Sequence, residues 1–163
     1  MKIAFLIIDM QTVHIQGRIE EKAVANACEY INYVSDLLRS KDHVVVHIQD
    51  VEGMEESNKE KFGFIPEVQI REQDLKVTKE YSNAFWKTEL ESLLRSHDVE
   101  LVVISGLEAQ HCVLFTYNGA RERGFKTVIL QNGILSSNPE SVVSTSRERN
   151  LISYPAIEYL VNR

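Results

Sequence analysis

The chain has 163 residues, of which 44% are apolar and 26% charged, and these proportions fit one compact domain over residues 1–163. Its 18 basic and 24 acidic residues give a net charge of −6 at pH 7, which leaves no basic excess for binding nucleic acid or an anionic membrane surface. The apolar opening segment, residues 3–8, is too short for a membrane span or a signal peptide, so we expect a cytoplasmic protein.

Short β-branched and aliphatic runs alternate along the chain with longer segments that have helical spacing. In chain order we predict a strand at 3–8, a helix at 20–39, strands at 43–48 and 75–78, a helix at 84–96, a strand at 101–105, a helix at 110–123, a strand at 126–130, a helix at 139–148, a weak strand at 151–153 and a helix at 155–162. Buried strands joined through helices pair in parallel by right-handed crossovers. The pattern therefore predicts an α/β fold: a three-layer, doubly wound (Rossmann-like) sheet with helices on both faces. The polar stretch 50–74 is predicted to be a surface excursion of the kind that often covers a site.

Residues capable of chemistry follow three of the predicted strands. Asp9 follows the first strand, Lys79 follows the strand at 75–78, and Cys112 opens the helix after the strand at 101–105. In a parallel sheet these strand ends meet at one edge, where ligands collect. Each residue alone has an ordinary explanation, since an aspartate can cap a turn, a lysine can be solvated and a cysteine can be a small buried apolar group. Their conjunction predicts a site.

A cysteine nucleophile needs help, because a thiol with a pKa near 8.5 is only about 3% ionised at pH 7. Lowering that pKa by about two units takes roughly 2.7 kcal/mol. We expect the Lys79 ammonium and the first turn of the helix to supply this for Cys112, while the Asp9 carboxylate takes the proton. Cys28 lies among apolar helix positions and is expected to be a buried apolar residue. Two cysteines so far apart do not indicate a disulfide scaffold, a zinc finger or a thioredoxin motif.

Three segments resemble the isochorismatase-like cysteine hydrolases in order and spacing: LIIDMQ at 6–11, VTKEYSNAF at 77–85 and SGLEAQHCVLFT at 105–116. The resemblance implies a six-stranded parallel sheet, assembly into a homodimer or a larger homo-oligomer, and a catalytic triad. In that triad Asp9 is the acid and base, Lys79 the cation and Cys112 the nucleophile.

The resemblance also implies a cis peptide bond between Leu107 and Glu108, which would aim the N–H groups of Glu108 and Cys112 at one oxyanion. The alternative is an ordinary trans turn with Glu108 as an acidic residue at a helix start. Phe85 and His111 are candidate substrate-binding residues, although Phe85 fits the core equally well and His111 fits a solvated helix turn. His14, soon after the first strand, is a weaker candidate.

The chain departs from the nicotinamidases of this family, which bind a metal through an Asp-x-His pair after the second strand. Here Asp50 is followed by Val51 and Glu52, and the five histidines are scattered. We therefore expect no metal and no other cofactor, and nicotinamide hydrolysis is disfavoured. The GLEA segment at 106–109 leaves the identity of the substrate open.

The leading hypothesis is an enzyme that hydrolyses an amide or ureido C–N bond of a small-molecule substrate through a thioester on Cys112. A phosphatase of the haloacid dehalogenase type requires a second aspartate at position 11, where this chain has Gln11, and a receiver domain requires further acidic residues after the first strand. A catalytically silent binding or scaffold protein with the isochorismatase fold remains as the alternative.

Overall fold

A computed structural model describes all 163 residues, Met1 to Arg163, and has six strands at its centre. They are β1 (Lys2–Ile8), β2 (Val44–Asp50), β3 (Leu75–Lys79), β4 (Val99–Leu107), β5 (Lys126–Leu135) and β6 (Leu151–Ile152). The order across the sheet is β3-β2-β1-β4-β5-β6, and every neighbouring pair is parallel. The predicted six-stranded, doubly wound parallel sheet is confirmed. The strand order reverses between β1 and β4, where such folds bind their ligands.

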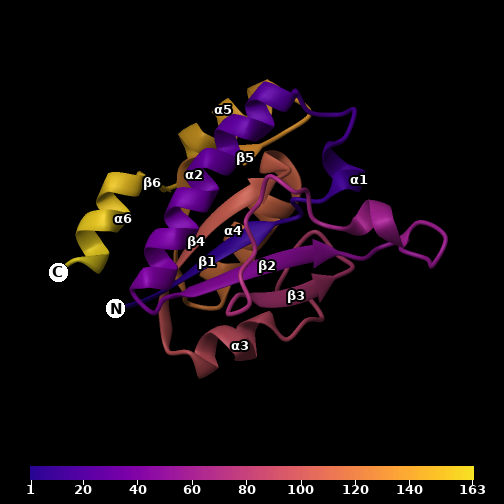
Figure 1. Cartoon of the computed structure of the whole chain (residues 1–163). Helices are drawn as coiled ribbons and strands as arrows, with labels where there is room; N and C mark the ends of the chain where they lie inside the picture. Colours follow the sequence, from indigo (N-terminus) through magenta and orange to yellow (C-terminus); the bar gives the residue numbers. More distant parts are fainter.

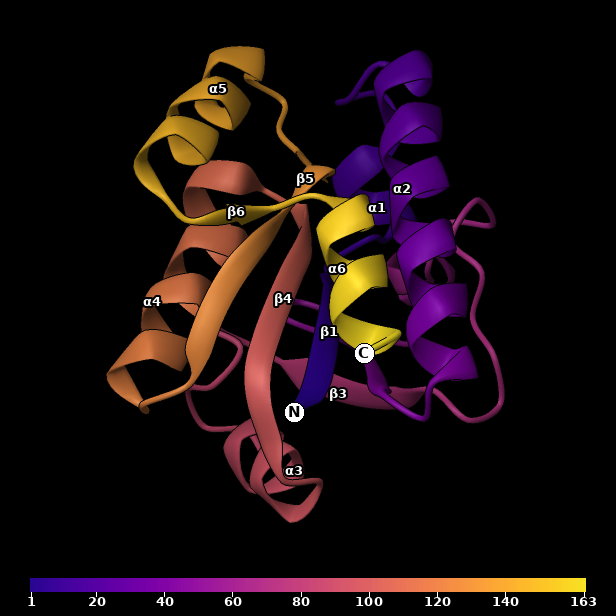
Figure 2. The ribbon, with the colours of Figure 1, turned by 90° about the vertical axis from the view of Figure 1, so that its left-hand side faces the viewer.

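Helices cover both faces of the sheet (Figures 1 and 2). They are α1 (Thr12–Ile15), α2 (Glu21–Ser40), α3 (Leu90–Ser96), α4 (Leu114–Glu122), α5 (Pro139–Glu148) and α6 (Tyr154–Val161), with a 3₁₀ turn η1 (Lys59–Phe62) and a π turn η2 (Ala109–Val113). The long α2 and the C-terminal α6 pack on one face, and α3, α4 and α5 pack on the other. None of these helices combines the length and the apolar character needed to cross a membrane.

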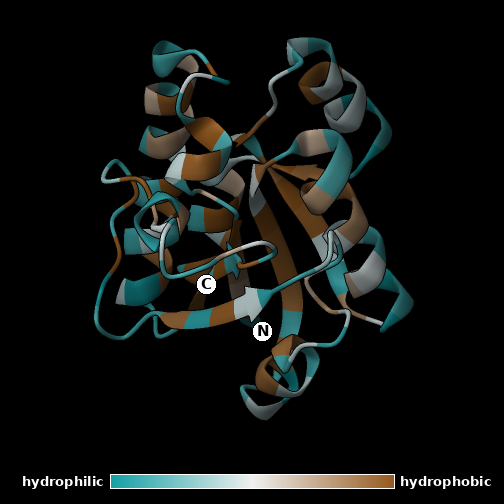
Figure 3. Ribbon diagram, turned by 90° about the vertical axis from the view of Figure 1, so that its right-hand side faces the viewer, coloured by the Kyte–Doolittle hydropathy of each residue, from teal (hydrophilic) through white to brown (hydrophobic).

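The ribbon of the central strands is mostly hydrophobic in Figure 3, as expected for strands that are covered by helices on both faces. In β1 the side chains of Ala4, Leu6 and Ile8 enter the core under α3 and α4. The alternate residues Phe5 and Ile7 enter the core under α2 and α6. Alternate side chains of the strand thus belong to two separate cores, one on each face of the sheet. A shift of the register by one residue would exchange the two sets of side chains, so this alternation specifies the register.

The helix predicted at 84–96 is half as long in the structure, where α3 begins only at Leu90. In the segment before α3, threonine side chains form hydrogen bonds with backbone N–H and carbonyl groups. Thr88 Oγ1 donates a hydrogen bond to the Ala84 carbonyl, and the Ala84 N–H donates to Thr116 Oγ1 at 3.0 Å. Side chains that bind backbone groups in this way compete with helical hydrogen bonds, so the segment forms turns.

Two further boundaries differ from the prediction. The helix expected at 110–123 is divided into η2 and α4, so Cys112 lies in a π turn rather than in the first turn of an α-helix. The strand expected at 126–130 continues to Leu135, after a register shift opposite β4 between Ile104 and Gly106. The segment after β2 crosses the surface as expected, but Ile65 and Val68 anchor it in the core under α2, and none of its residues 51–74 lines the cavity described below.

Candidate active site

Strand ends along the carboxyl edge of the sheet carry the candidate site. Asp9 directly follows β1, Lys79 ends β3, and Cys112 lies in η2, which follows β4. At this edge Gly106 of β4 has φ = +103°, and a Cβ there would collide with the backbone of Ile8. Glycine therefore lets β4 and β1 approach closely just before both strands enter the site.

Lys79 lies between the other two residues. Its Nζ is 3.0 Å from Asp9 Oδ2, 3.3 Å from Cys112 Sγ and 3.9 Å from Asp50 Oδ2. Lys79 is 2% exposed and Asp9 3% exposed. A carboxylate, an ammonium and a thiol thus share one water-poor corner, in which electrostatic interactions are strong.

Burial and charge together raise the pKa values of both Asp9 and Lys79. Burial raises the pKa of Asp9 above its ordinary value, although the charge of Lys79 acts in the opposite direction. Burial works against the ammonium form of Lys79, but the acidic groups around it, Asp9 first, together outweigh this effect and raise the pKa of the lysine. Lys79 therefore stays charged at neutral pH, while Asp9 is a stronger base than an exposed aspartate.

The thiol departs from the expectation. Burial, followed by the negative charge of Asp9, raises the pKa of Cys112 to about 12, and the ammonium of Lys79 offsets only part of this. The predicted lowering of this pKa is therefore wrong. The reason is that sulfur faces the carboxylate as well as the lysine in a desolvated corner. The proton stays on the sulfur of the resting protein.

The backbone beside Cys112 has an unusual course. The peptide bond between Leu107 and Glu108 is cis, as the resemblance implies. The Glu108 N–H donates no hydrogen bond within the protein, whereas its carbonyl accepts from His111 and Val113 and so closes the π turn. Glu108 and Cys112 line the same cavity, so this free N–H can donate to an oxyanion formed there.

A cavity of about 570 Å³ opens over these residues. It is lined by Asp9, His14, Arg18, Asp50, Ser82, Leu107, Glu108, His111, Cys112 and Ser137. The candidates Glu108 and His111 thus face the same space as the thiol. Phe85 does not line it, because its 3% exposed ring stacks on Phe125 with the ring centroids 6.0 Å apart. The core interpretation of Phe85 is the correct one.

Sequence reasoning missed four cavity residues: Arg18, Asp50, Ser82 and Ser137. Asp50 ends β2, so the rule that located Asp9 and Lys79 also locates it. Gln11 holds Asp50 in place, since its Nε2 donates to the Asp50 carbonyl and its Oε1 accepts from the Asp50 N–H, both at 2.8 Å. Ser137 follows β5, while Arg18 and Ser82 lie in connecting segments that show no sequence pattern.

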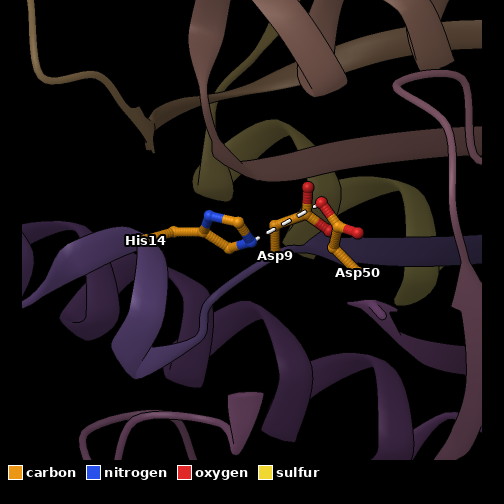
Figure 4. Close-up of side chains that lie close together, drawn as sticks. All are labelled: Asp9, His14 and Asp50. Carbon is orange, nitrogen blue, oxygen red and sulfur yellow. Dashed lines mark ion pairs between the residues drawn. The ribbon is translucent and has the colours of Figure 1, made fainter. Parts of the chain in front are cut away.

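Asp9, His14 and Asp50 form the one group of side chains with a metal-binding composition (Figure 4). One donor atom from each lies within 4.8 Å of the others. His14 Nε2 is 3.6 Å from Asp50 Oδ2, too long for a hydrogen bond. His14 Nε2 and Asp9 Oδ1 are buried without a hydrogen-bond partner. Both residues line the cavity, so a molecule bound there can satisfy both atoms.

Comparison with known proteins places the chain in a family. A family model described as the isochorismatase domain matches residues 3–149. The uncharacterized isochorismatase family protein YrdC of Bacillus subtilis is 28% identical over 135 residues, which cover 80% of this chain and 72% of that protein. N-carbamoylsarcosine amidase from Thermoplasma acidophilum superposes with a TM-score of 0.77 at 21% identity, covering 91% of this chain and 92% of that one. The pyrazinamidase of Pyrococcus horikoshii, solved in complex with zinc, superposes with a TM-score of 0.78 at 20% identity, covering 94% and 100%.

Proposed function

Because the chain belongs to the isochorismatase family, we propose that it is a cysteine hydrolase that cleaves a C–N bond of a small amide or ureido compound through a thioester on Cys112. The observation that carries this proposal is the position of Lys79 Nζ, 3.0 Å from the Asp9 carboxylate and 3.3 Å from the Cys112 sulfur. The amidase names of two structural neighbours support the choice of bond.

In the first half of the reaction Cys112 Sγ attacks the carbonyl carbon of the substrate while its proton passes to Asp9. The carbonyl electron pair moves to oxygen, and the N–H groups of Glu108 and Cys112 stabilise that oxyanion. When the intermediate collapses, the C–N bond breaks and Asp9 returns the proton to the leaving nitrogen. Lys79 remains protonated throughout and stabilises negative charge on sulfur and on the carboxylate.

In the second half Asp9 takes a proton from water as the water oxygen attacks the thioester carbon. The C–S bond breaks, the acid leaves, and the proton returns to sulfur. A thiol pKa of about 12 means that the thiolate develops only during attack, together with proton transfer to Asp9. The raised pKa of Asp9 assists both transfers.

We propose further that the reaction needs no metal ion. Asp9, His14 and Asp50 include suitable donors, but Lys79 Nζ is already 3.0 Å and 3.9 Å from the two carboxylates. A divalent cation among the same oxygens would lie close to this buried ammonium, and like charges repel strongly where water is scarce. The ammonium thus supplies the positive charge of the site, and Asp9 stays free for proton transfer.

A catalytically silent binding protein is the alternative, and the raised thiol pKa is the observation that favours it. A panel of small amides and ureido compounds, assayed for release of ammonia or amine, separates the two. Wild type and Cys28→Ser should cleave the same panel members, because Cys28 is buried and away from the cavity. Cys112→Ala should cleave none, and Cys112→Ser should be slower by about 10³ or more, since the nucleophile has changed.

Mass spectrometry of the intact protein, quenched during turnover, should show an acyl adduct on Cys112 that hydroxylamine removes. Release of product by Cys112→Ala at the wild-type rate would reject the mechanism. Absence of turnover and of the adduct across the panel would favour the binding protein.

A further inference from the structure

The cavity contains one permanent cation that no carboxylate neutralises. Lys79 contacts Asp9 and Asp50. Arg18 lines the same cavity, but its guanidinium makes neither an ion pair nor a hydrogen bond within the protein. Other arginines, such as Arg39 and Arg123, each contact a carboxylate at 3.0 Å or less. Arg18 therefore offers a full set of donors to whatever enters the cavity.

The carboxylates of the cavity are already engaged. Asp9 and Asp50 face Lys79, as described above. Glu108 accepts hydrogen bonds from Gln110 Nε2 at 3.1 Å and, more weakly, from the Ser137 N–H at 3.4 Å. The acidic groups thus have positive or hydrogen-bonding neighbours, and they leave the charge of Arg18 uncompensated.

The remaining polar side chains of the cavity are also free. Those of Ser82, His111 and Ser137 make no hydrogen bond within the protein, and all three can donate one. A planar guanidinium binds carboxylates through two parallel hydrogen bonds. A carboxylate is therefore the ligand group that best matches these partners.

The apolar part of the lining is small. Leu107 and Cys112 are its apolar members, and no phenylalanine, tyrosine or tryptophan takes part. Sites for aromatic ligands usually present apolar and aromatic side chains for the ring to contact. This cavity lacks such a surface, which disfavours an aromatic amide and favours a short, polar, aliphatic molecule.

We propose that Arg18 is a specificity-determining residue that binds the carboxylate of the substrate, and that the substrate class is a small aliphatic acid carrying an amide or ureido group. This inference rests on the proposed hydrolase function for the identity of the cleaved group. The binding step can nevertheless be tested without turnover, because Cys112 itself reports on what enters the cavity.

The test compares alkylation of Cys112 by paired reagents that differ in one charge. Iodoacetate and iodoacetamide form a short pair, and N-bromoacetylglycine and its primary amide form a longer one. The rate at Cys112 is followed by peptide mass spectrometry in wild type, Arg18→Gln, Arg18→Lys and Arg147→Gln. Arg147 is an exposed arginine without an ion pair that does not line the cavity, so it is the matched control.

In at least one pair we expect the ratio of the anionic to the neutral rate to fall by about tenfold from wild type to Arg18→Gln, the size expected for a charged hydrogen bond. Arg18→Lys should retain part of the ratio, and Arg147→Gln should match wild type. An unchanged ratio in Arg18→Gln for both pairs would overturn the inference. Because Arg18 is exposed, the variant should fold, which its thermal unfolding midpoint verifies.

Different results would reject the proposed hydrolase function and the proposed role of Arg18. Retained charge selectivity without cleavage of any amide would reject the hydrolase and keep Arg18 as a carboxylate-binding residue. Cleavage of a neutral diamide and of the matching amide acid with equal kcat/KM would reject the role of Arg18 and keep the hydrolase.

Discussion

Lys79 Nζ lies 3.0 Å from Asp9 Oδ2 in a corner where both residues are almost completely buried. Removing one member of such a pair should lower the free energy of unfolding strongly, because the remaining charge is buried without water to solvate it. The same ammonium also reaches the sulfur of Cys112 at 3.3 Å. One buried lysine thus holds the proposed base and the proposed nucleophile together.

Replacing Lys79 should lower the activity strongly. Lys79→Met leaves the Asp9 carboxylate without its counter-charge, so the pKa of Asp9 rises further and less of the base form is present at neutral pH. We expect kcat/KM to fall by about 10² to 10⁴, the range of general acid–base catalysis. The exposed Lys76 on the same strand provides the control, and Lys76→Met should stay within about twofold of wild type, as surface substitutions usually do. Activity of Lys79→Met at the wild-type level would contradict the mechanism.

Asp9→Asn should have opposite effects on the thiol and on the reaction. The charge of Asp9 raises the pKa of Cys112, so its removal lowers that pKa, increases the thiolate fraction at pH 8 and accelerates alkylation by iodoacetamide. Hydrolysis should be lost, because the proton acceptor is gone. Asp50→Asn serves as the control, because Asp9 is the carboxylate whose charge and hydrogen bond raise the pKa of Cys112. Slower alkylation in Asp9→Asn than in wild type would show that the carboxylate activates the resting thiol instead.

Removal of metal should leave catalysis intact. If the ammonium of Lys79 supplies the positive charge, dialysis against a chelator should not change kcat, with the metal content measured by mass spectrometry before and after. Added Zn²⁺ should inhibit, because a metal bound by Asp9 and His14 occupies the base. Loss of activity on chelation and recovery with Zn²⁺ would assign the group Asp9, His14 and Asp50 to a metal.

A second buried charge cluster should govern stability. Asp74 accepts hydrogen bonds from Arg39 Nε at 2.8 Å and Nη2 at 2.6 Å and lies 2.9 Å from His47 Nε2, and its side chain is 0% exposed. We expect Asp74→Asn to lower the free energy of unfolding by about 3 to 5 kcal/mol, as for a broken buried pair. Asp36 also contacts Arg39, but its side chain is 54% exposed, so Asp36→Asn should cost less than about 1 kcal/mol. Equal costs in urea denaturation would contradict this reasoning.

The same cluster predicts a dependence on pH. Burial acts to raise the pKa of Asp74, but hydrogen bonds from Arg39, from the Arg71 N–H and from His47 hold it below the ordinary 3.8. The carboxylate therefore contributes its full stabilisation above about pH 3.8 and loses it as the pH falls through the lower value of the folded state. Asp74→Asn should lack this part of the acid destabilisation.

Much of the fold could be predicted from sequence because its signals are local. Continuous apolar runs specify strands covered on both faces, and the end of each strand specifies which edge receives the next residues. Asp9, Lys79 and Asp50 all obey this rule, because each of them ends a strand or directly follows one. The prediction of a helix at 84–96 was wrong for residues 84–89, because Thr116, which lies in α4, accepts a hydrogen bond from the Ala84 N–H.

What the sequence determined by itself is the succession of strands and helices along the chain and the presence of Asp9, Lys79 and Cys112 after three of the strands. Tertiary structure alone decided that Arg18 and Ser137 face the cavity, that Phe85 turns into the core, and that the thiol keeps its proton. The physical reason is that a strand and its end are encoded by neighbouring residues. The direction of a loop side chain and the pKa of a buried sulfur depend instead on the sum of desolvation and charge from segments that meet only in the folded protein.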